Sequence, residues 1–205
     1  LSFDIRSNDD FFNNVPPLQV NCASCSYGNL DLGTINFTLE RKNEDLLVVN
    51  NFISQRKNHK LSLNGQWQHN HEISRTNLFG EYNTKDIERE IERLGLPSSI
   101  KDSGLKLKYD IRWDNSPVDF IVNNLNGNFR ANLNEGIVDV DDRGARFLSI
   151  FSLQTLVRKL KLDFRDIFSD GMYYDEIKGD FNIDKGVVYT KNTFMKGAAG
   201  DLSVK

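Results

Sequence analysis

The two cysteines of the chain, Cys22 and Cys25, stand three residues apart. A Cys-x-x-Cys pair can hold half of a zinc site, act as a redox couple or close a local disulfide. Zinc would need a second cysteine pair or a nearby histidine cluster, and the sequence around this pair has neither. We favour two small residues near a strand end, either free or joined in a disulfide in an oxidising compartment.

Two histidines, His69 and His71, would share one face of a strand, where both could reach a metal ion. No third ligand is near, and the neighbours Asn70 and Glu72 are typical of a solvated surface. We therefore interpret both as exposed histidines and expect no metal site.

Acidic residues gather in two further places. Residues 139–144 begin like a calcium loop, but Arg143 replaces a ligand and Ile150 stands where the closing glutamate belongs. Asp163 and Asp166 could form an acid and base pair, yet their context favours solvated strand and turn residues. The sequence also lacks the common motifs for nucleophile, nucleotide and zinc-protease sites. It predicts a protein that is not an enzyme and uses no cofactor.

Composition describes a folded chain without a nucleic-acid surface. The 205 residues carry 26 basic and 29 acidic side chains, a net charge of -3 and a hydrophobic share of 39%. Scattered charges of this kind exclude nucleic acid as a partner. No apolar run reaches the roughly 18 residues of a membrane helix, and the chain starts and stops as a fragment would. Targeting signals are therefore expected outside it.

The strongest pattern is an alternation of apolar and polar residues, which is typical of half-buried strands. Between residues 105 and 113 every odd position is apolar or aromatic and every even position is charged. The pattern recurs at residues 35–39, 61–67 and 129–133. We predict a mainly β (α+β) fold, a curled antiparallel sheet or groove of repeated hairpins with one or two flanking helices.

Glycine-containing turns at residues 134–136 and 184–186 predict hairpins, because glycine accepts a positive φ. Each follows an apolar-x-Gly-x-Phe start, which indicates one hairpin design used twice. In these starts Gly127 and Gly179 would share a face with the following phenylalanine, where a missing side chain can admit an aromatic ring or mark a bend.

Two segments break the alternation. Residues 84–94 predict a surface helix laid on the sheet, with Thr84 as N-cap and Gly95 just past the end. Its apolar stripe consists of Ile87, Ile91 and Leu94. Residues 143–160 are apolar over a wide arc and predict a buried helix or helix pair, followed by a strand at residues 161–168.

Several motifs of the chain closely resemble the C-terminal region of YhdP-type members of the AsmA-like superfamily. The resemblance is close over residues 95–205 and looser over residues 1–94. Val157 departs from it, because the family tends to have a proline there. The motifs are Trp113-Asp-Asn-Ser-Pro117, Leu125-Asn-Gly-Asn-Phe129, the run from Leu148 to Phe164, Gly171, the run from Ile177 to Val187, and Met195-Lys-Gly197.

The resemblance implies that residues 1–205 are a single fragment of a longer periplasmic β-groove region, anchored in the inner membrane of a Gram-negative envelope by a helix outside the fragment. It implies phospholipid transport between inner and outer membrane, without any chemical step, in support of the outer-membrane permeability barrier. Phospholipid acyl chains are the expected partners, and outer-membrane or other envelope proteins are further candidates.

The alternation suits such a conduit, since exposing an acyl chain of about 16 carbons to water costs about 12 kcal/mol at ~0.8 per CH₂. We expect tails to slide along one apolar face while head groups stay at the wet rim. The expected lining residues are Leu61, Leu63, Trp67, Leu105, Leu107, Tyr109, Ile111, Phe129, Leu133, Phe181 and Ile183.

Three alternatives remain open at this point. The same apolar faces could pack on the chain's own helices and strands as a closed core. The chain could instead be a scaffold or assembly module that handles outer-membrane proteins through its edge strands. An enzyme of unknown class would require a polar pocket with converging titratable groups.

Overall fold

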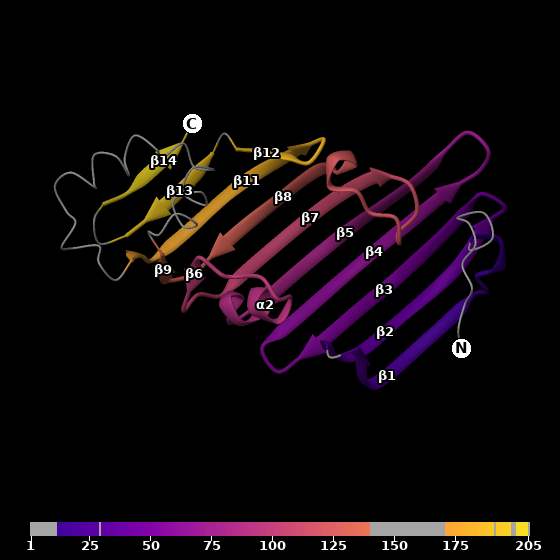
Figure 1. The fold of residues 1–205 in the computed structure, drawn as a ribbon, viewed down its shortest axis with the longest axis horizontal. Helices are drawn as coiled ribbons and strands as arrows, with labels where there is room; N and C mark the ends of the chain where they lie inside the picture. The colour runs from indigo at the N-terminus through magenta and orange to yellow at the C-terminus, as the bar shows by residue number, and fades with distance from the viewer. Residues whose placement is uncertain (1–11, 29, 140–170, 191, 198–199, 205) are drawn as a thin grey trace. The chain divides into compact units, whose positions relative to one another are not determined.

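The structure is a computed structural model that describes residues 12–28, 30–139, 171–190, 192–197 and 200–204 (Figure 1). Strands dominate it, with short helical segments between them. The elements in chain order are β1 (Leu18–Tyr27), β2 (Leu30–Asn43), β3 (Leu46–Arg56), β4 (His59–His69), β5 (Ser74–Thr84), α2 (Ile87–Arg93), β6 (Ile100–Lys101), β7 (Leu105–Asp114), η1 (Val122–Asn124), β8 (Asn126–Leu133), β9 (Gly136–Val138), β10 (Met172–Tyr174), β11 (Glu176–Asp184), β12 (Val187–Thr190), β13 (Thr193–Lys196) and β14 (Leu202–Val204).

Most of the strands belong to one antiparallel sheet. Within the described ranges, eleven strands form it in the order β1-β2-β3-β4-β5-β7-β8-β11-β13-β14, with β12 paired to β11. Three short strands form a second sheet in the order β10-β9-β6. Strands that follow one another in sequence pair directly from β1 to β5, as short turns between antiparallel strands allow. The predicted mainly β, antiparallel fold is confirmed.

Strand β7 shows how the sequence specifies its own sheet face. Its odd-numbered residues are half-buried or buried and its even-numbered residues are exposed along the whole strand, from Leu105 to Asp114. Successive side chains on a strand point to opposite faces, so the alternation in sequence becomes one dry and one wet face. The strand predicted at residues 105–113 is therefore confirmed.

One of the two predicted hairpins forms and the other does not. At residues 184–186 the chain reverses between β11 and β12, with Lys185 at φ 49° and Gly186 at φ 77°, as a tight hairpin turn requires. At residues 134–136 the prediction is wrong, because β8 and β9 belong to different sheets. After the turn, Val138 is fully buried and pairs with β6 and β10 instead of returning along β8.

The glycines of the two similar segments do have close neighbours. A Cβ on Gly127 would lie 2.2 Å from the carbonyl oxygen of Asp110, so this glycine allows a close approach of backbones. A Cβ on Gly179 would lie 3.1 Å from the ring of Phe181, the aromatic residue two positions ahead. The expectation that a missing side chain admits a ring is confirmed at Gly179.

The surface helix is present but begins later than expected. It spans Ile87–Arg93, and its N-cap is Asp86, whose side chain accepts a hydrogen bond from the Arg89 amide. Thr84 was the wrong cap, because its hydroxyl instead accepts the amide of Asp86 in a local turn before the helix. Leu94, assigned to the apolar stripe, is exposed. Gly95 follows the end at φ 74°, as predicted.

Other expectations fall on residues that the structure does not describe. These are the buried helix at residues 143–160, the strand at residues 161–168, and the Asp163 and Asp166 pair. Within the described ranges, the helices all fall short of the length and apolarity required to span a bilayer.

The chain divides into two compact units. Unit 1 comprises Leu1–Glu81, Tyr109–Gly127 and Ile183–Val187, and unit 2 comprises Tyr82–Lys108, Asn128–Asn182 and Val188–Lys205. Unit 1 has a small core of Phe12, Leu47 and Trp67, with Val15 and Leu39 packed against it. Unit 2 has a larger core of Ile87, Ile100, Leu133, Val138, Met172, Tyr174, Ile177, Phe181 and Met195.

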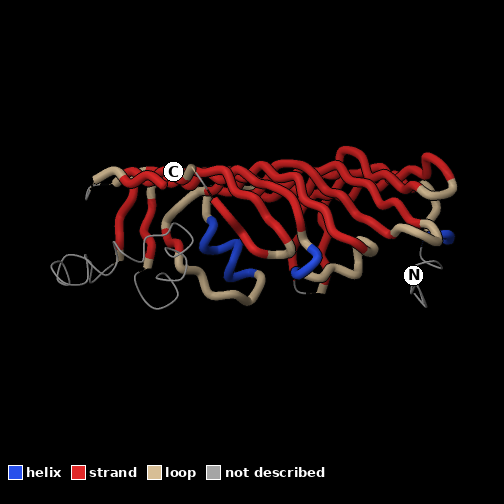
Figure 2. Tube along the Cα trace, turned by 90° about the horizontal axis from the view of Figure 1, so that it is seen from above, coloured by secondary structure: helices blue, strands red, loops and turns tan. Residues whose placement is uncertain are grey.

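Helix α2 belongs to unit 2 and lies on one side of the strands (Figure 2). Ile87 is buried in the core of unit 2, and Ile91 packs against that core. Two side chains of the predicted apolar stripe therefore pack on the core of unit 2, as expected of a helix laid on the sheet.

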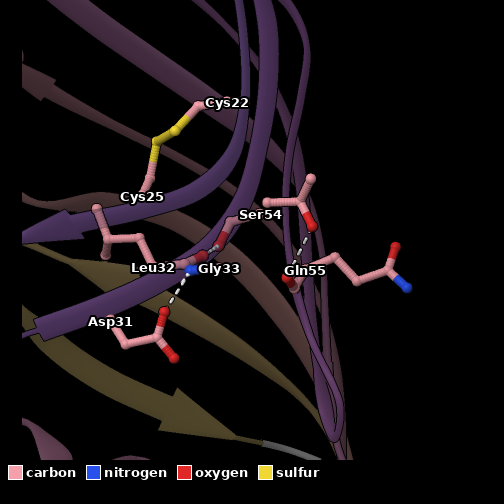
Figure 3. Close-up of a disulfide and its surroundings, with 8 residues drawn as sticks. Cys22, Cys25, Asp31, Leu32, Gly33, Ser54 and Gln55 are labelled. Atoms are coloured by element: carbon pink, nitrogen blue, oxygen red, sulfur yellow. Dashed lines mark hydrogen bonds between the residues drawn. A yellow bond between two sulfur atoms is a disulfide. The ribbon is translucent and has the colours of Figure 1, made fainter.

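The cysteines form a disulfide in β1 (Figure 3). Cys22 is opposite Ile35 and Cys25 is opposite Gly33, so β1 has one residue more than β2 between these pairs. An extra residue of this kind is a β-bulge. The disulfide spans the bulge and closes it covalently. Of the two states that the sequence left open, the structure has the oxidised one.

Candidate functional site

One face of β2, β3 and β4 in unit 1 is built from apolar residues in register. Leu39 lies opposite Val49, and Val49 lies opposite Gly65. In the next row Leu47 lies opposite Trp67. Directly opposed residues of antiparallel strands share a face of the sheet, so these side chains form one apolar surface.

A β-bulge in β3 keeps this surface continuous. Val49 pairs with Gly65, but the next pair is Phe52 with Leu63, so β3 has one extra residue. The bulge contains Asn51, which has φ 51° and donates its backbone amide to the Asn64 side chain at 2.9 Å. The bulge changes which positions of β3 face the apolar side, from odd numbers before it to even numbers after it.

A cavity of about 220 Å³ lies on this apolar face. Even a sealed apolar cavity of about 150 Å³ is large enough to bind a small hydrocarbon. Gly65 is part of the wall, and a Cβ there would lie 2.4 Å from Leu78 Cδ2 and 3.2 Å from Val49 Cγ1. The described lining consists of Val15, Leu39, Leu47, Val49, Gly65, Gln66, Trp67, Thr76, Leu78, Pro117 and Val118.

The lining is suited to hydrocarbon and to no acid or base chemistry. None of its described residues carries a titratable side chain. The hydroxyl of Thr76 is already used, since it donates to the carbonyl oxygen of Asn115 at 2.8 Å. The Trp67 indole is also satisfied, because its Nε1 donates to Ser74 Oγ at 3.1 Å. A ligand in the cavity therefore meets apolar contacts and almost no hydrogen-bonding groups.

The N-terminal segment closes one side of the apolar face. Phe12 is buried, and its ring meets the Trp67 ring edge to face at a centroid distance of 4.9 Å. The Arg41 guanidinium lies over the Phe12 ring, 4.7 Å from its centroid, and donates a hydrogen bond to the Phe12 carbonyl. His69, expected to be exposed, is half-buried because its ring also lies against Phe12. Val15 continues this segment into the cavity wall.

A loop between β7 and β8 forms the wall on another side, through Pro117 and Val118. Its start is held firmly to β5. The amide of Asn115 donates to the Ser74 carbonyl at 2.8 Å, and the indole of Trp113 donates to the Ser116 carbonyl at 3.0 Å. The cavity is thus bordered by sheet, N-terminal segment and loop, all within unit 1, and it is partly open to solvent.

The predicted lining residues fall into both units. In unit 1, Trp67 lines the cavity, and Leu61 and Leu63 lie half-buried on the same face of β4. Tyr109, Ile111 and Ile183 are also half-buried residues of unit 1. Burial raises the pKa of Tyr109 to about 12.

The unit 2 members contact the chain's own core. Leu133 and Phe181 are buried there, and Phe129 stacks on Phe181 with centroids 4.6 Å apart. Leu105 packs against the same core, and Leu107 is half-buried on β7.

Several cavity residues were not expected from the sequence. Leu47 and Val49 lie in an unbroken apolar run at residues 46–49. Without alternation, the sequence does not indicate which side of the sheet each of them faces. Leu78 is followed by apolar Phe79, so the alternation is obscured there as well. The mainly apolar stretch at residues 117–122, interrupted by Asp119, was the available signal for the loop wall.

Comparison with known proteins places the chain in a family. The family model described as YhdP protein matches residues 3–205. The chain is 29% identical over 196 residues to the intermembrane phospholipid transporter YhdP of Escherichia coli (strain K12). The matched residues make up 95% of this chain and 15% of that protein. The chain therefore spans a small part of the length of that relative. No solved structure matches it. The chain belongs to the YhdP family.

Proposed function

We propose that this chain is a segment of an intermembrane phospholipid transporter, and that its apolar cavity holds a stretch of an acyl chain in passage. The observation that carries the proposal is a cavity of about 220 Å³ whose described lining has no titratable side chain. Such a site binds hydrocarbon by burial alone and leaves all bonds of the ligand intact.

The relative in Escherichia coli supports the class of cargo, since its name describes an intermembrane phospholipid transporter. The proposed setting is the periplasmic part of a protein anchored in the inner membrane by a segment outside residues 1–205. The disulfide between Cys22 and Cys25 supports this setting, because such bonds persist in oxidising compartments such as the bacterial periplasm. Passage of phospholipid to the outer membrane would maintain its permeability barrier.

The route of the tail begins from the residues that share the cavity's sheet face. In unit 1 the tail would contact Leu61, Leu63 and Trp67 on β4, and then Tyr109, Ile111 and Ile183. In unit 2, taken by itself, the proposed contacts are Leu105, Leu107 and Phe129, with Leu133 and Phe181 as the buried core residues that support them. Within each unit the contacts must be apolar, because each methylene exposed to water costs about 0.8 kcal/mol.

Photo-crosslinking from two adjacent positions of β5 tests the proposal. Leu78 lines the cavity, whereas Phe79 is equally apolar but exposed, and neighbouring strand residues face opposite sides. A photoreactive amino acid at Leu78 should label phospholipid from vesicles of phosphatidylethanolamine and phosphatidylglycerol, and the same residue at Phe79 should not. Equal labelling from both positions, or none from Leu78, would reject the cavity as a tail site.

A further inference from the structure

The loop from β7 to β8 ends in an apolar tip that faces solvent, and this tip is not explained by the binding of a tail alone. The connection can be followed in Figure 1, where it contains the short helical turn η1. The tip is defined here as residues 117–122, Pro-Val-Asp-Phe-Ile-Val. The exposed fractions of its apolar side chains are 62% for Val118, 49% for Phe120, 46% for Ile121 and 55% for Val122.

This exposure is a fixed property of the loop, because the base of the loop is tied down. Besides the hydrogen bonds of Asn115 and Ser116 to β5 and Trp113, the Trp113 ring meets the Phe120 ring edge to face at 5.3 Å. Gly186 also packs on the loop, donating its amide to the Leu125 carbonyl at 2.8 Å. Beside it, Val187 adds another exposed apolar side chain, at 52%.

The apolar tip is continuous with the cavity. Val118 lines the cavity and is also among the most exposed apolar residues that the structure describes. Pro117 likewise lines the cavity and is exposed. A hydrocarbon chain could therefore move from outside the molecule to the cavity wall while remaining in contact with apolar side chains.

The chemistry of the tip favours a lipid surface over a protein partner. Within the tip, the carbonyls of Ile121 and Val122 accept the amides of Asn124 and Leu125 at 3.0 Å each, and the amide of Asp119 donates to the Ser116 carbonyl at 3.2 Å. Backbone groups must be satisfied internally where a segment enters a bilayer, and these three hydrogen bonds do so for part of the tip. The tip contains Asp119 and no basic residue, so its attraction to a bilayer would be apolar, and added salt would not weaken it.

Resting on the proposed function, we propose that the tip at residues 117–122 is the port through which phospholipid tails pass between a bilayer and the cavity. The tip inserts its apolar side chains among the lipid tails, and Val118 is the contact shared by bilayer and cavity. Transfer through the port avoids exposure of the tail to water, which is the main barrier to lipid exchange.

The test measures the rate and the extent of lipid uptake separately. The 205-residue chain is mixed with vesicles of phosphatidylethanolamine and phosphatidylglycerol that contain a phospholipid with a fluorescent tail. The variant is Ile121→Ser with Val122→Ser, which changes the tip but not the cavity lining. The control is Leu94→Ser with Leu96→Ser, which removes similarly exposed apolar residues, at 65% and 57%, from the segment after α2.

The tip variant should take up lipid about tenfold more slowly than the unmodified chain and reach the same final amount. The control should match the unmodified chain in both rate and final amount. Both results should hold at low and at high salt. An unchanged rate in the tip variant, or an equal loss in the control, would overturn the port. If the unmodified chain takes up no lipid, the proposed function itself fails.

A second measurement does not depend on the serine variants folding normally. A bimane label on Ile121→Cys should shift its emission to shorter wavelength with vesicles and be quenched by lipids carrying a spin label in the tail. The same label on Leu96→Cys should remain unchanged. Equal responses at the two positions, or no response at the tip, would reject insertion.

Discussion

Filling part of the cavity should weaken tail binding strongly without unfolding the protein, and Val49→Phe is the substitution that does this. Val49 lines the cavity in the middle of β3 and is only half-buried, so a larger side chain can extend into existing space. Filling a pre-existing cavity commonly leaves stability unchanged or raises it, here by up to about 1 kcal/mol.

The magnitude follows from the volume. A cavity of about 220 Å³ holds about seven groups of about 30 Å³ each, the share of one water molecule and close to that of a methylene. Burial of seven methylenes at about 0.8 kcal/mol each contributes about 6 kcal/mol. The phenyl side chain has four more carbons than that of valine, so about 3 kcal/mol is lost and binding weakens by roughly two orders of magnitude.

The assay is a fluorescence titration with a phospholipid that carries a reporter on its tail, together with urea unfolding of each variant. The matched control is Val48→Phe, since Val48 lies opposite Glu40 on the other face of the sheet and is not among the cavity-lining residues described. This control should bind as the unmodified chain does. A folded Val49→Phe protein that binds with undiminished affinity, or a control that weakens equally, would refute the assignment of the tail to this cavity.

Two further predictions concern the sheet that supports the site. Gly127→Ala should lower the free energy of unfolding by about 3 kcal/mol, because φ is 142° and the new Cβ would meet the Asp110 carbonyl. Gly95→Ala, in open space at φ 74°, should lower it by about 1 kcal/mol. Urea unfolding of both variants measures the difference, and similar losses would contradict this reasoning. The hydrogen bond from Arg130 holds the pKa of Asp180 below its usual 3.8, so the pair stabilises the fold above that pH and the effect is lost as pH falls through the lowered pKa. In Arg130→Gln the carboxyl pKa measured by NMR should rise toward 3.8 and the stability difference from the unmodified chain should disappear in acid, and an unshifted pKa would contradict this.

Local patterns predicted the strands well where one residue type alternates with another. Strand β7 and the turn at residues 184–186 follow from alternation and from the φ preference of glycine, both of which are properties of adjacent residues. The turn at residues 134–136 carries the same local signal, but burial of Val138 in unit 2 decides where β9 pairs. Such a distant contact is invisible in the local sequence.

The candidate cavity was only partly predictable, for a related reason. Alternation identified the strand of Trp67. The residues of β3 that share the face of Val49 depend on a bulge at Asn51, which the local sequence pattern did not predict. Phe12 lies outside any strand, so its packing on Trp67 could not be anticipated. The sequence indicated a sheet with one apolar and one polar face. The register of its strands decides which apolar side chains line the cavity.

The most direct test of the account is a crystal structure of the chain grown with a phospholipid whose tails carry bromine. The account predicts an anomalous bromine signal in the cavity between Leu78 and Val118, with the lining side chains in contact with the tail. A cavity without bromine, filled instead by the protein's own side chains in crystals that contain the lipid, would contradict it and make this face an ordinary core.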